Sequence, residues 1–382
     1  MARDTNQRPK TSGYQTFIAS EGIPIHGGQG ISNLMDVELA PWPRMGGRGA
    51  YVDLLGQEGV TGFWVAEIPP GGSLNPERHL YDETIYVMAG RGSAKVWAGG
   101  RDAPVGTTSV FEWQRGSMFS PPNNTWHQLF NLSGSDPALV VAATTAPLVM
   151  DLFHNVDFVF NCDYQFTDRF KGEPDFYDVR ERFYFQPGRK WLWETNLIPD
   201  VRGLDLIDDP VKSAGGRGTH YQMGANVLAG HLYEFPAGAY HKAHAHGAGA
   251  IILHVSDCKG FSLMWPGEAG IRPYEGGHED KVIRVDWADN SLISPASGWF
   301  HQHFNTGTTV ARHLAFRLGS HRHDVVFHSA ASREGQQVSV SNGGTLIEYE
   351  EEDPRIRRDF IAELNKSGLE FHMDRLMAGA GV

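Results

Sequence analysis

Pro295-Ala296-Ser297-Gly298-Trp299-Phe300-His301-Gln302-His303-Phe304-Asn305 has a close counterpart earlier in the chain, Pro121-Pro122-Asn123-Asn124-Thr125-Trp126-His127-Gln128-Leu129-Phe130-Asn131. Both stretches contain a proline, a histidine six residues later, and the run His-Gln-x-Phe-Asn. In each half, a glycine, a further histidine group, an apolar run and a tryptophan come before the stretch, in that order. The same order occurring twice indicates two related modules, each with a candidate metal site.

The upstream histidine groups supply further candidate ligands. These groups are Glu77, His79 and Glu83 in the first half, and His244 and His246 in the second. Side chains at positions i and i+2 of a strand point to the same face, so His244 and His246 can both reach one ion inside a barrel. A facing strand carrying His301 would complete a triangle of three imidazoles. The sequence therefore predicts a metal site in the second half.

The composition is that of a globular, turn-rich chain. Its 382 residues are enough for two domains of ordinary size, and its 45 glycines and 21 prolines favour short strands separated by turns. The formal net charge is -12 and there is no block of lysine and arginine, so we expect no nucleic acid partner. We interpret the excess of negative charge as a feature that favours solubility.

Cysteine usage and hydropathy bear on location. Cys162 and Cys258 are the only two cysteines, which is too few for a disulfide framework or a thiolate zinc site, and a cytoplasmic location is predicted. The N-terminal residues are polar, and no apolar run approaches the roughly 18 to 20 residues of a membrane span. We therefore expect no membrane association and no secretion.

The pattern along the chain predicts an all-β fold of two barrels. Short β-branched and aromatic runs alternate with Gly, Pro and Asn turns in both halves. A short helix is expected near the C-terminus, because Ile356, Phe360 and Leu364 have helical spacing and Asp353-Pro354 precedes them. The predicted boundaries are an N-terminal arm (1–50), barrel 1 (51–150), an interdomain segment (151–220), barrel 2 (221–330) and a tail with the helix (331–382).

These motifs resemble those of the cupin superfamily, whose first motif has the form G-x5-H-x-H-x3,4-E-x6-G and whose second has the form G-x5-P-x-G-x2-H-x3-N. The matching residues of the first half are Gly72, His79, Glu83, Gly90, Gly116, Pro121, His127 and Asn131. Those of the second half are Gly238, His244, His246, Pro295, Gly298, His301 and Asn305. The resemblance covers about residues 60–145 and 222–328 and implies a bicupin, with the ligands on facing strands inside each barrel. The superfamily's activities are diverse, so the fold alone does not name a reaction.

The two halves depart from the motif in different ways. Glu77 stands where the first histidine would be, and Ala250 stands where the glutamate would be in the second half. A site of His244, His246 and His301 without a carboxylate resembles the three-histidine sites of gentisate-type and diketone-cleaving dioxygenases. In gentisate-type enzymes, however, this cluster lies in the first cupin.

The resemblance implies Fe(II) at the C-terminal site, while Mn(II), Zn(II) and Ni(II) stay open as alternatives. Without a carboxylate, the ion keeps its full charge, which favours a chelating anion such as an enolised diketone or a hydroxy-acid.

The N-terminal site has three interpretations. Glu77, His79, Glu83 and His127 together could bind a hard ion such as manganese or iron(II). Alternatively, Glu77 points outward at a solvated entrance near Arg78 and Tyr81, which leaves three ligands. The third interpretation is a structural copy without metal.

Other residues are assigned by their position relative to these ligands. His303 should share the inward face of His301, and we predict that it is a catalytic acid or base, or a hydrogen-bond donor to a ligand. Trp299 lies two residues before His301 and should point to the same face of the strand, so it is predicted to line the substrate pocket. His241 is expected in a loop or at the rim. His313, His321, His323 and His328 are expected to be surface or hydrogen-bonded residues with a structural role.

Three functions follow. The leading prediction is a non-haem Fe(II) oxygenase that cleaves a small oxygenated or aromatic substrate with O2. The alternatives are a metal-dependent isomerase, decarboxylase or hydrolase, and a non-catalytic bicupin that binds a ligand or has a structural role. We expect a homo-oligomer, a dimer or larger, because the arm, the aromatic interdomain segment and the tail offer surfaces to cover.

Overall fold

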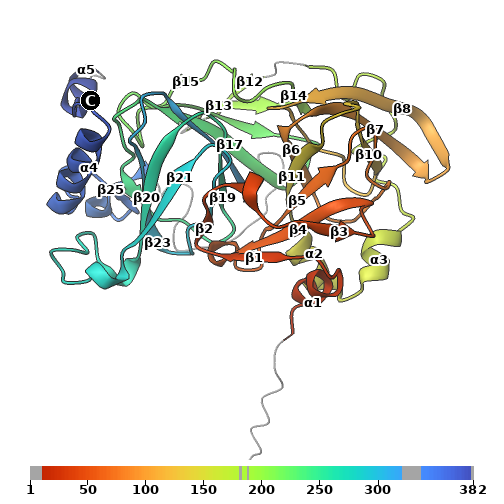
Figure 1. Cartoon of the computed structure of the whole chain (residues 1–382), viewed down its shortest axis with the longest axis horizontal. Coiled ribbons are helices and arrows are strands. Elements are labelled where there is room, and N and C mark those ends of the chain that lie inside the picture. The colour runs from red at the N-terminus through yellow and green to blue at the C-terminus, as the bar shows by residue number, and fades with distance from the viewer. Residues whose placement is uncertain (1–10, 180–182, 187–188, 321–336, 380–382) are drawn as a thin grey trace, which may run out of the picture.

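The computed structural model describes residues 11–179, 183–186, 189–320 and 337–379. In this part of the chain, strands form two barrels that lie side by side, with the N-terminal half at one end of the molecule and the C-terminal helices at the other (Figure 1). Each barrel pairs a large sheet with a smaller one.

Barrel 1 consists of a larger sheet with the order β1-β4-β5-β11-β6-β9-β14, in which β3 also pairs with β4, and a smaller sheet with the order β10-β7-β8. Its strands are β4 (Gly47–Leu54), β5 (Gly62–Ile68), β6 (Glu83–Ala89), β7 (Arg91–Gly100), β8 (Ala103–Gln114), β9 (Met118–Phe119), β10 (Trp126–Asn131) and β11 (Ala138–Thr144).

Barrel 2 repeats this arrangement. Its strands are β16 (Arg217–Gln222), β17 (Leu228–Phe235), β18 (Ala243–His244), β19 (Ile251–His254), β20 (Lys259–Pro266), β21 (Ile283–Ala288), β22 (Leu292–Ile293), β23 (Trp299–Asn305) and β24 (Ala311–Leu318). The order β17-β24-β19-β22 matches β5-β11-β6-β9, and β23-β20-β21 matches β10-β7-β8. The structure thus confirms the predicted all-β fold of two barrels.

The two large sheets pack against each other through their outer faces. On β5, Trp64 and Ala66 point into barrel 1, whereas Phe63 and Val65 belong to a second core shared with barrel 2. Phe63 contacts Phe316 of β24 there, with ring centroids 6.5 Å apart. Because side chains alternate between faces along a strand, both faces of β5 are buried, which explains its uninterrupted apolar run.

The described residues of the segments outside the barrels also form helices and strands. The arm contains helix α1 (Gly13–Ser20); its strand β1 (Ile25–Gly28) pairs with β4, whereas β2 (Gly30–Ile31) pairs with β22 of barrel 2. The arm is therefore less irregular than its polar composition indicated, and it joins both barrels. The remaining elements up to barrel 2 are β3 (Ala40–Trp42), α2 (Ala146–Phe153), α3 (Val156–Asn161), β12 (Phe183–Gln186), β13 (Arg189–Glu194), β14 (Leu197–Ile198) and β15 (Ile207–Asp208).

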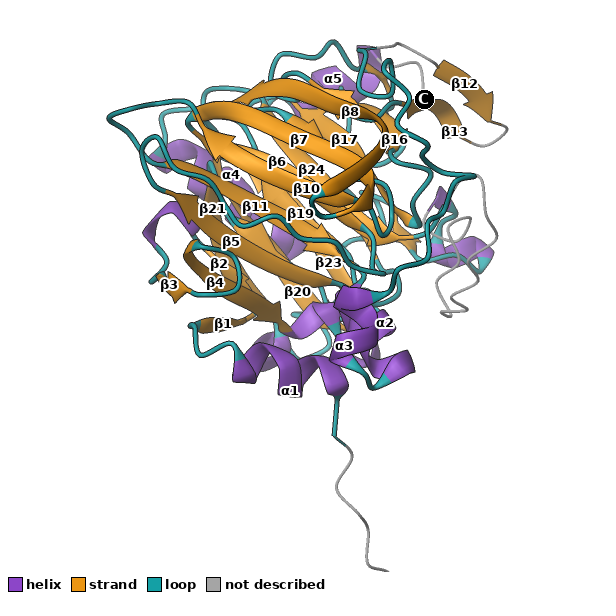
Figure 2. Cartoon of the chain, turned by 90° about the vertical axis from the view of Figure 1, so that its right-hand side faces the viewer, coloured by secondary structure: helices purple, strands orange, loops and turns teal. Residues whose placement is uncertain are grey.

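The C-terminal tail covers one end of barrel 2. The predicted helix is α4 (Pro354–Lys366); Asp353 caps its N-terminus, and Ile356, Phe360 and Leu364 are buried. A further strand, β25 (Leu346–Ile347), pairs with β18, and a last helix, α5 (Met373–Gly379), follows α4. Figure 2 shows the helices at the periphery of the strands. Within the described residues, no helix is long and apolar enough to cross a membrane.

Candidate metal centres

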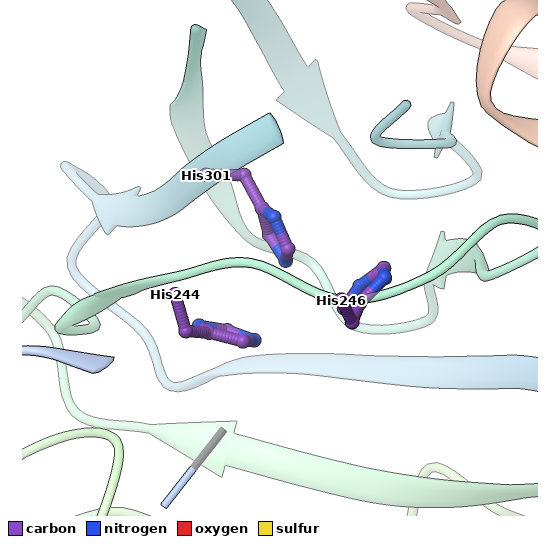
Figure 3. A group of neighbouring side chains, drawn as sticks. All are labelled: His244, His246 and His301. Carbon is purple, nitrogen blue, oxygen red and sulfur yellow. The ribbon is translucent and has the colours of Figure 1, made fainter. Parts of the chain in front are cut away.

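The C-terminal centre is assembled by one strand pair and one loop. His244 on β18 stands directly opposite His301 on β23, and His246 follows in the loop after β18. The ring centroids of His244 and His246 lie 4.3 and 4.6 Å from that of His301, and the three rings converge (Figure 3). One nitrogen from each residue lies within 4.8 Å of the others, so the structure brings together the three predicted ligands.

Hydrogen bonds fix the tautomer of these three rings. The Nδ1 atoms of His244, His246 and His301 lie 3.3, 2.8 and 3.3 Å from the backbone oxygens of Lys242, Gly247 and Trp299. A carbonyl can only accept, so each Nδ1 carries the proton and each Nε2 presents its lone pair to the centre. The buried Nε2 of His301 has no hydrogen-bond partner within the described structure. This donor set fits a divalent transition metal.

Burial keeps the three imidazoles neutral. The pKa of His246 is lowered to about 4, chiefly by burial; the Gly247 carbonyl opposes this shift, and the charge of Lys212 adds to it. Burial followed by the charge of Lys212 places the pKa of His244 well below its usual range. A neutral imidazole keeps the lone pair that metal binding requires, so these ligands need no deprotonation at neutral pH.

The cavity around the three ligands holds further histidines. His303 lines it, as predicted, and its ring centroid lies 5.6 Å from that of His301. His241 and His313 also line it and are buried. His241 lies in the loop before β18, as predicted, but it is buried and not at the rim; its backbone N–H donates to the His303 carbonyl.

The outcome for the remaining histidines and for Trp299 is mixed. The prediction of a surface or hydrogen-bonded His313 is not met, since it is buried and its Nδ1 has no hydrogen-bond partner in the described chain. His321, His323 and His328 lie outside the described residues. Trp299 is half-buried and is not among the described residues that line this cavity, so its substrate-lining role stays a prediction.

Two residues at this centre have no counterpart in the sequence motifs. Lys212, from the segment before β16, places its Nζ 3.1 Å from Nε2 of His244. Arg317 of β24 lines the same cavity. The alternation of side chains along a strand could have identified Arg317, because Arg317 and His313 lie four residues apart on β24 and point to the same face. For Lys212 the sequence offers no signal except its charge.

The N-terminal centre brings together the four predicted residues of the first half. Glu77 and His127 pair through their backbones, His79 lies in the following loop, and Glu83 begins β6. Oε2 of Glu83 lies 3.2 Å from Nε2 of His127 and 3.6 Å from Nε2 of His79, and Oε1 of Glu77 lies 3.8 Å from Nε2 of His127. All four ligand atoms lie within 4.8 Å of one another.

Arg44 determines the orientation of Glu77. Its Nη1 donates to Oε2 of Glu77 at 2.5 Å, and its Nε donates to Glu21 at 2.7 Å. The second oxygen of Glu77 therefore faces His127, and the outward orientation considered above is not observed. Tyr81 does not mark a solvated entrance either, because it is buried and stacks on His79 with centroids 3.6 Å apart.

Charges in the N-terminal centre stabilise a cation. Burial opposes ionisation of Glu83, but the close approach of the His127 and His79 rings to its carboxylate outweighs burial and holds the pKa of the carboxyl well below its usual range. Burial lowers the pKa of His127, whereas Glu83 raises it more, so the net pKa is raised. The buried Nε2 of His79 and Oε2 of Glu83 have no hydrogen-bond partner in the described structure. A metal ion would take the place of the proton between His127 and Glu83.

No protein-family model and no curated protein matches this chain. Solved structures of Bacillus subtilis oxalate decarboxylase are similar to it in fold. A variant of that enzyme with four adjacent residues replaced has a TM-score of 0.47 and 13% identity, covering 77% of this chain and 78% of that chain. A single-residue variant has a TM-score of 0.46 and 12% identity over the same shares. The structure at pH 4.6 has a TM-score of 0.45 and 14% identity, covering 76% of each chain.

Proposed function

We propose that this chain is a metal-dependent oxygenase that binds Fe(II) at His244, His246 and His301 and cleaves a small oxygenated or aromatic substrate with O2. The observation that carries the proposal is the set of three neutral imidazoles with Nε2 atoms directed at one point. Ferrous iron bound by such a set supplies one-electron chemistry with dioxygen and leaves coordination positions open for substrate.

The residues around the ligands support binding of an anion. Among the described residues that line the cavity there is no Asp or Glu, whereas Lys212 and Arg317 are present. The small Ala250 lines the cavity at the motif position where a glutamate would stand, which leaves room beside the ligands. A substrate that loses a proton to become a chelating enolate or carboxylate would be stabilised there.

His303 is placed to donate a hydrogen bond to such a substrate. Its Nδ1 contacts the Ser262 hydroxyl at 2.7 Å, and its ring lines the cavity. Burial lowers the pKa of His303 well below the usual range, so the ring is neutral at physiological pH. We infer that Nε2–H of His303 orients a substrate oxygen or returns a proton to the product.

The decisive experiment loads the protein with Fe(II) under anaerobic conditions and then measures oxygen uptake over a panel of diketones, hydroxybenzoates and hydroxy-acids. We expect uptake with at least one class of compound, and its loss in the His301→Ala variant. Stoichiometric iron without uptake for any compound would contradict the proposal.

A second candidate function uses the N-terminal centre without dioxygen. Because Arg44 takes one oxygen of Glu77, the other faces the centre and could act as an acid or base beside His79, Glu83 and His127. Mn(II) or Zn(II) there would serve an isomerase, decarboxylase or hydrolase. Unchanged metal content and unchanged turnover in the Glu83→Gln variant would eliminate this candidate. A non-catalytic bicupin, by contrast, would contain no stoichiometric metal even after reconstitution.

A further inference from the structure

Lys212 lies at the C-terminal centre although it belongs to no ligand motif. Its backbone carbonyl accepts a hydrogen bond of 2.7 Å from the N–H of Lys242, which fixes it beside β18. From there its Nζ reaches to 3.1 Å from Nε2 of His244. An ammonium group can only donate, so it uses the lone pair of His244 that a metal ion would also use.

Lys212 also stands where two hollows meet. The cavity of the centre and a second hollow formed by β16 and β17 share the lining residues Lys212, His231, Tyr233 and Arg317. Both shared charges are positive, although Asp209 lines the outer hollow. A small anion that passes from the outer hollow to the ligands would therefore pass these two cations.

Metal binding changes the environment of Lys212. Once a cation takes the lone pair of His244, the ammonium group loses this acceptor and lies close to a second positive charge. The repulsion between the two positive charges costs free energy, and an anion bound beside both of them offsets it. The metal and a carboxylate should therefore favour each other's binding.

The N-terminal centre has the opposite charge pattern. Its nearest cation, Arg44, is paired with Glu77 and Glu21, and Glu83 adds a further negative charge. An anionic ligand should therefore bind more weakly at this centre than at the C-terminal one when both hold the same metal ion. Lys212 thus distinguishes the two centres by the charge of the ligand that each accepts.

We propose that Lys212 determines the specificity of the C-terminal centre for a small carboxylate, whose oxygen accepts from Nζ when the three histidines hold a metal ion. The inference rests on the proposed function, because it takes the same centre as the site of reaction. It adds to that function a carboxylate-bearing substrate and the residue that recognises it.

The test uses the full chain in a His127→Ala background, which weakens the N-terminal centre, with Co(II) as a spectroscopic probe of the C-terminal one. Glycolate and its uncharged amide, glycolamide, are titrated against the visible Co(II) spectrum and by calorimetry. The variants are Lys212→Met, which removes the charge, and Lys212→Arg, which keeps it. Lys281→Met is the matched control, because Lys281 pairs with Glu268 at 2.9 Å and does not line the cavity.

We expect Lys212→Met to weaken glycolate binding by about tenfold or more, with glycolamide binding unchanged. In the absence of glycolate, the same variant should bind Co(II) more tightly than the parent, since the competing ammonium group is gone. Lys212→Arg should retain part of the glycolate affinity, and Lys281→Met should retain all of it.

The possible failures are distinguishable. If the parent binds Co(II) but Lys212→Met binds glycolate as well as the parent does, the role of Lys212 is refuted and the metal centre stands. If the parent binds no Co(II) at the three histidines, the proposed function is refuted, and the role of Lys212 with it. Thermal unfolding of each variant shows whether a loss of binding reflects a loss of fold.

Discussion

The hydroxyl of Ser262 lies 2.7 Å from Nδ1 of His303, and the same oxygen accepts a hydrogen bond of 3.0 Å from the indole N–H of Trp287. The indole can only donate, so the hydroxyl proton of Ser262 is free to point at His303. Nδ1 of His303 is its only acceptor among the hydrogen bonds of the described structure. His303 therefore carries its proton on Nε2, unlike the metal-ligand histidines, which carry theirs on Nδ1.

Replacing Ser262 by alanine should remove the hydrogen bond that selects this tautomer of His303. We expect His303 in Ser262→Ala to populate both tautomers, which nitrogen-15 chemical shifts of the imidazole would detect in zinc-loaded protein. Turnover should fall by about tenfold with metal content unchanged. Ser109→Ala, which removes a buried hydroxyl from barrel 1, is the matched control. A single unchanged tautomer in Ser262→Ala would show that this hydroxyl does not set it.

The two centres should bind metal independently. We expect two ions per chain in the reconstituted wild type, one in His301→Ala and one in His127→Ala, as measured by elemental analysis. Each substitution removes one ligand from a buried group and leaves the other group intact. His372→Ala, outside both groups, should keep two ions. One ion in the wild type that is lost only in His301→Ala would identify barrel 1 as a structural copy.

The ligand groups were predictable because each is encoded locally. His244 and His246 are two residues apart, which lets both reach one point although only His244 lies on a strand, and the second motif supplies His301 from the strand opposite. The barrel order follows from the same repeat, with two-residue periodicity determining which side chains point inward.

Lys212 and Arg44 were not predictable in this way. Both reach their centres from segments without periodic structure, and the contacts that place them join residues 32 and 33 positions apart in the chain. Such contacts depend on how the segments pack, which no local pattern records. The burial of His241 was missed for a similar reason, since its backbone pairing with His303 links distant parts of barrel 2.

A loop of barrel 1 should determine the geometry of the C-terminal centre. Gly249, in the loop after His246, donates to the Gly56 carbonyl at 2.9 Å, and its own carbonyl accepts from Thr61 at 2.9 Å. A Cβ at Gly56 would meet the carbonyl oxygens of Ser294 and Pro295 closer than real Cβ atoms approach.

We therefore expect Gly56→Ala to lower the free energy of unfolding by about 1–3 kcal/mol. It should also weaken metal binding at the C-terminal centre by about tenfold, since the loop that carries His246 must shift. Urea unfolding and Co(II) titration measure the two effects. Gly134→Ala, where a Cβ would meet open space, should change neither. Tight Co(II) binding in a destabilised Gly56→Ala variant would show that this loop does not determine the geometry of the metal centre.

Glu352 should make the stability of the tail dependent on pH. It is buried and accepts hydrogen bonds from the Tyr240 hydroxyl and, at 3.1 Å, from Gln302 beside the metal ligand His301. Burial raises its pKa to about 7, although both hydrogen bonds and Arg357 act in the opposite direction. The folded state therefore holds this proton more tightly than the unfolded chain, in which the pKa is near its ordinary value of about 4.5. The stabilisation is fully present below the unfolded pKa and is lost as the pH rises through about 7.

Glu352→Gln should remove this dependence, because glutamine stays neutral at every pH. We expect the variant to be more stable than the wild type at pH 8 by about 1–2 kcal/mol, with the difference shrinking several-fold as the pH falls to about 5. Urea unfolding between pH 5 and pH 8 measures it, and the exposed Glu370→Gln serves as the control. Parallel pH profiles for wild type and Glu352→Gln would mean that Glu352 is ionised in the folded protein across this range. In that case Arg357, 4.0 Å from Glu352, would be the group that holds the carboxylate in its ionised form.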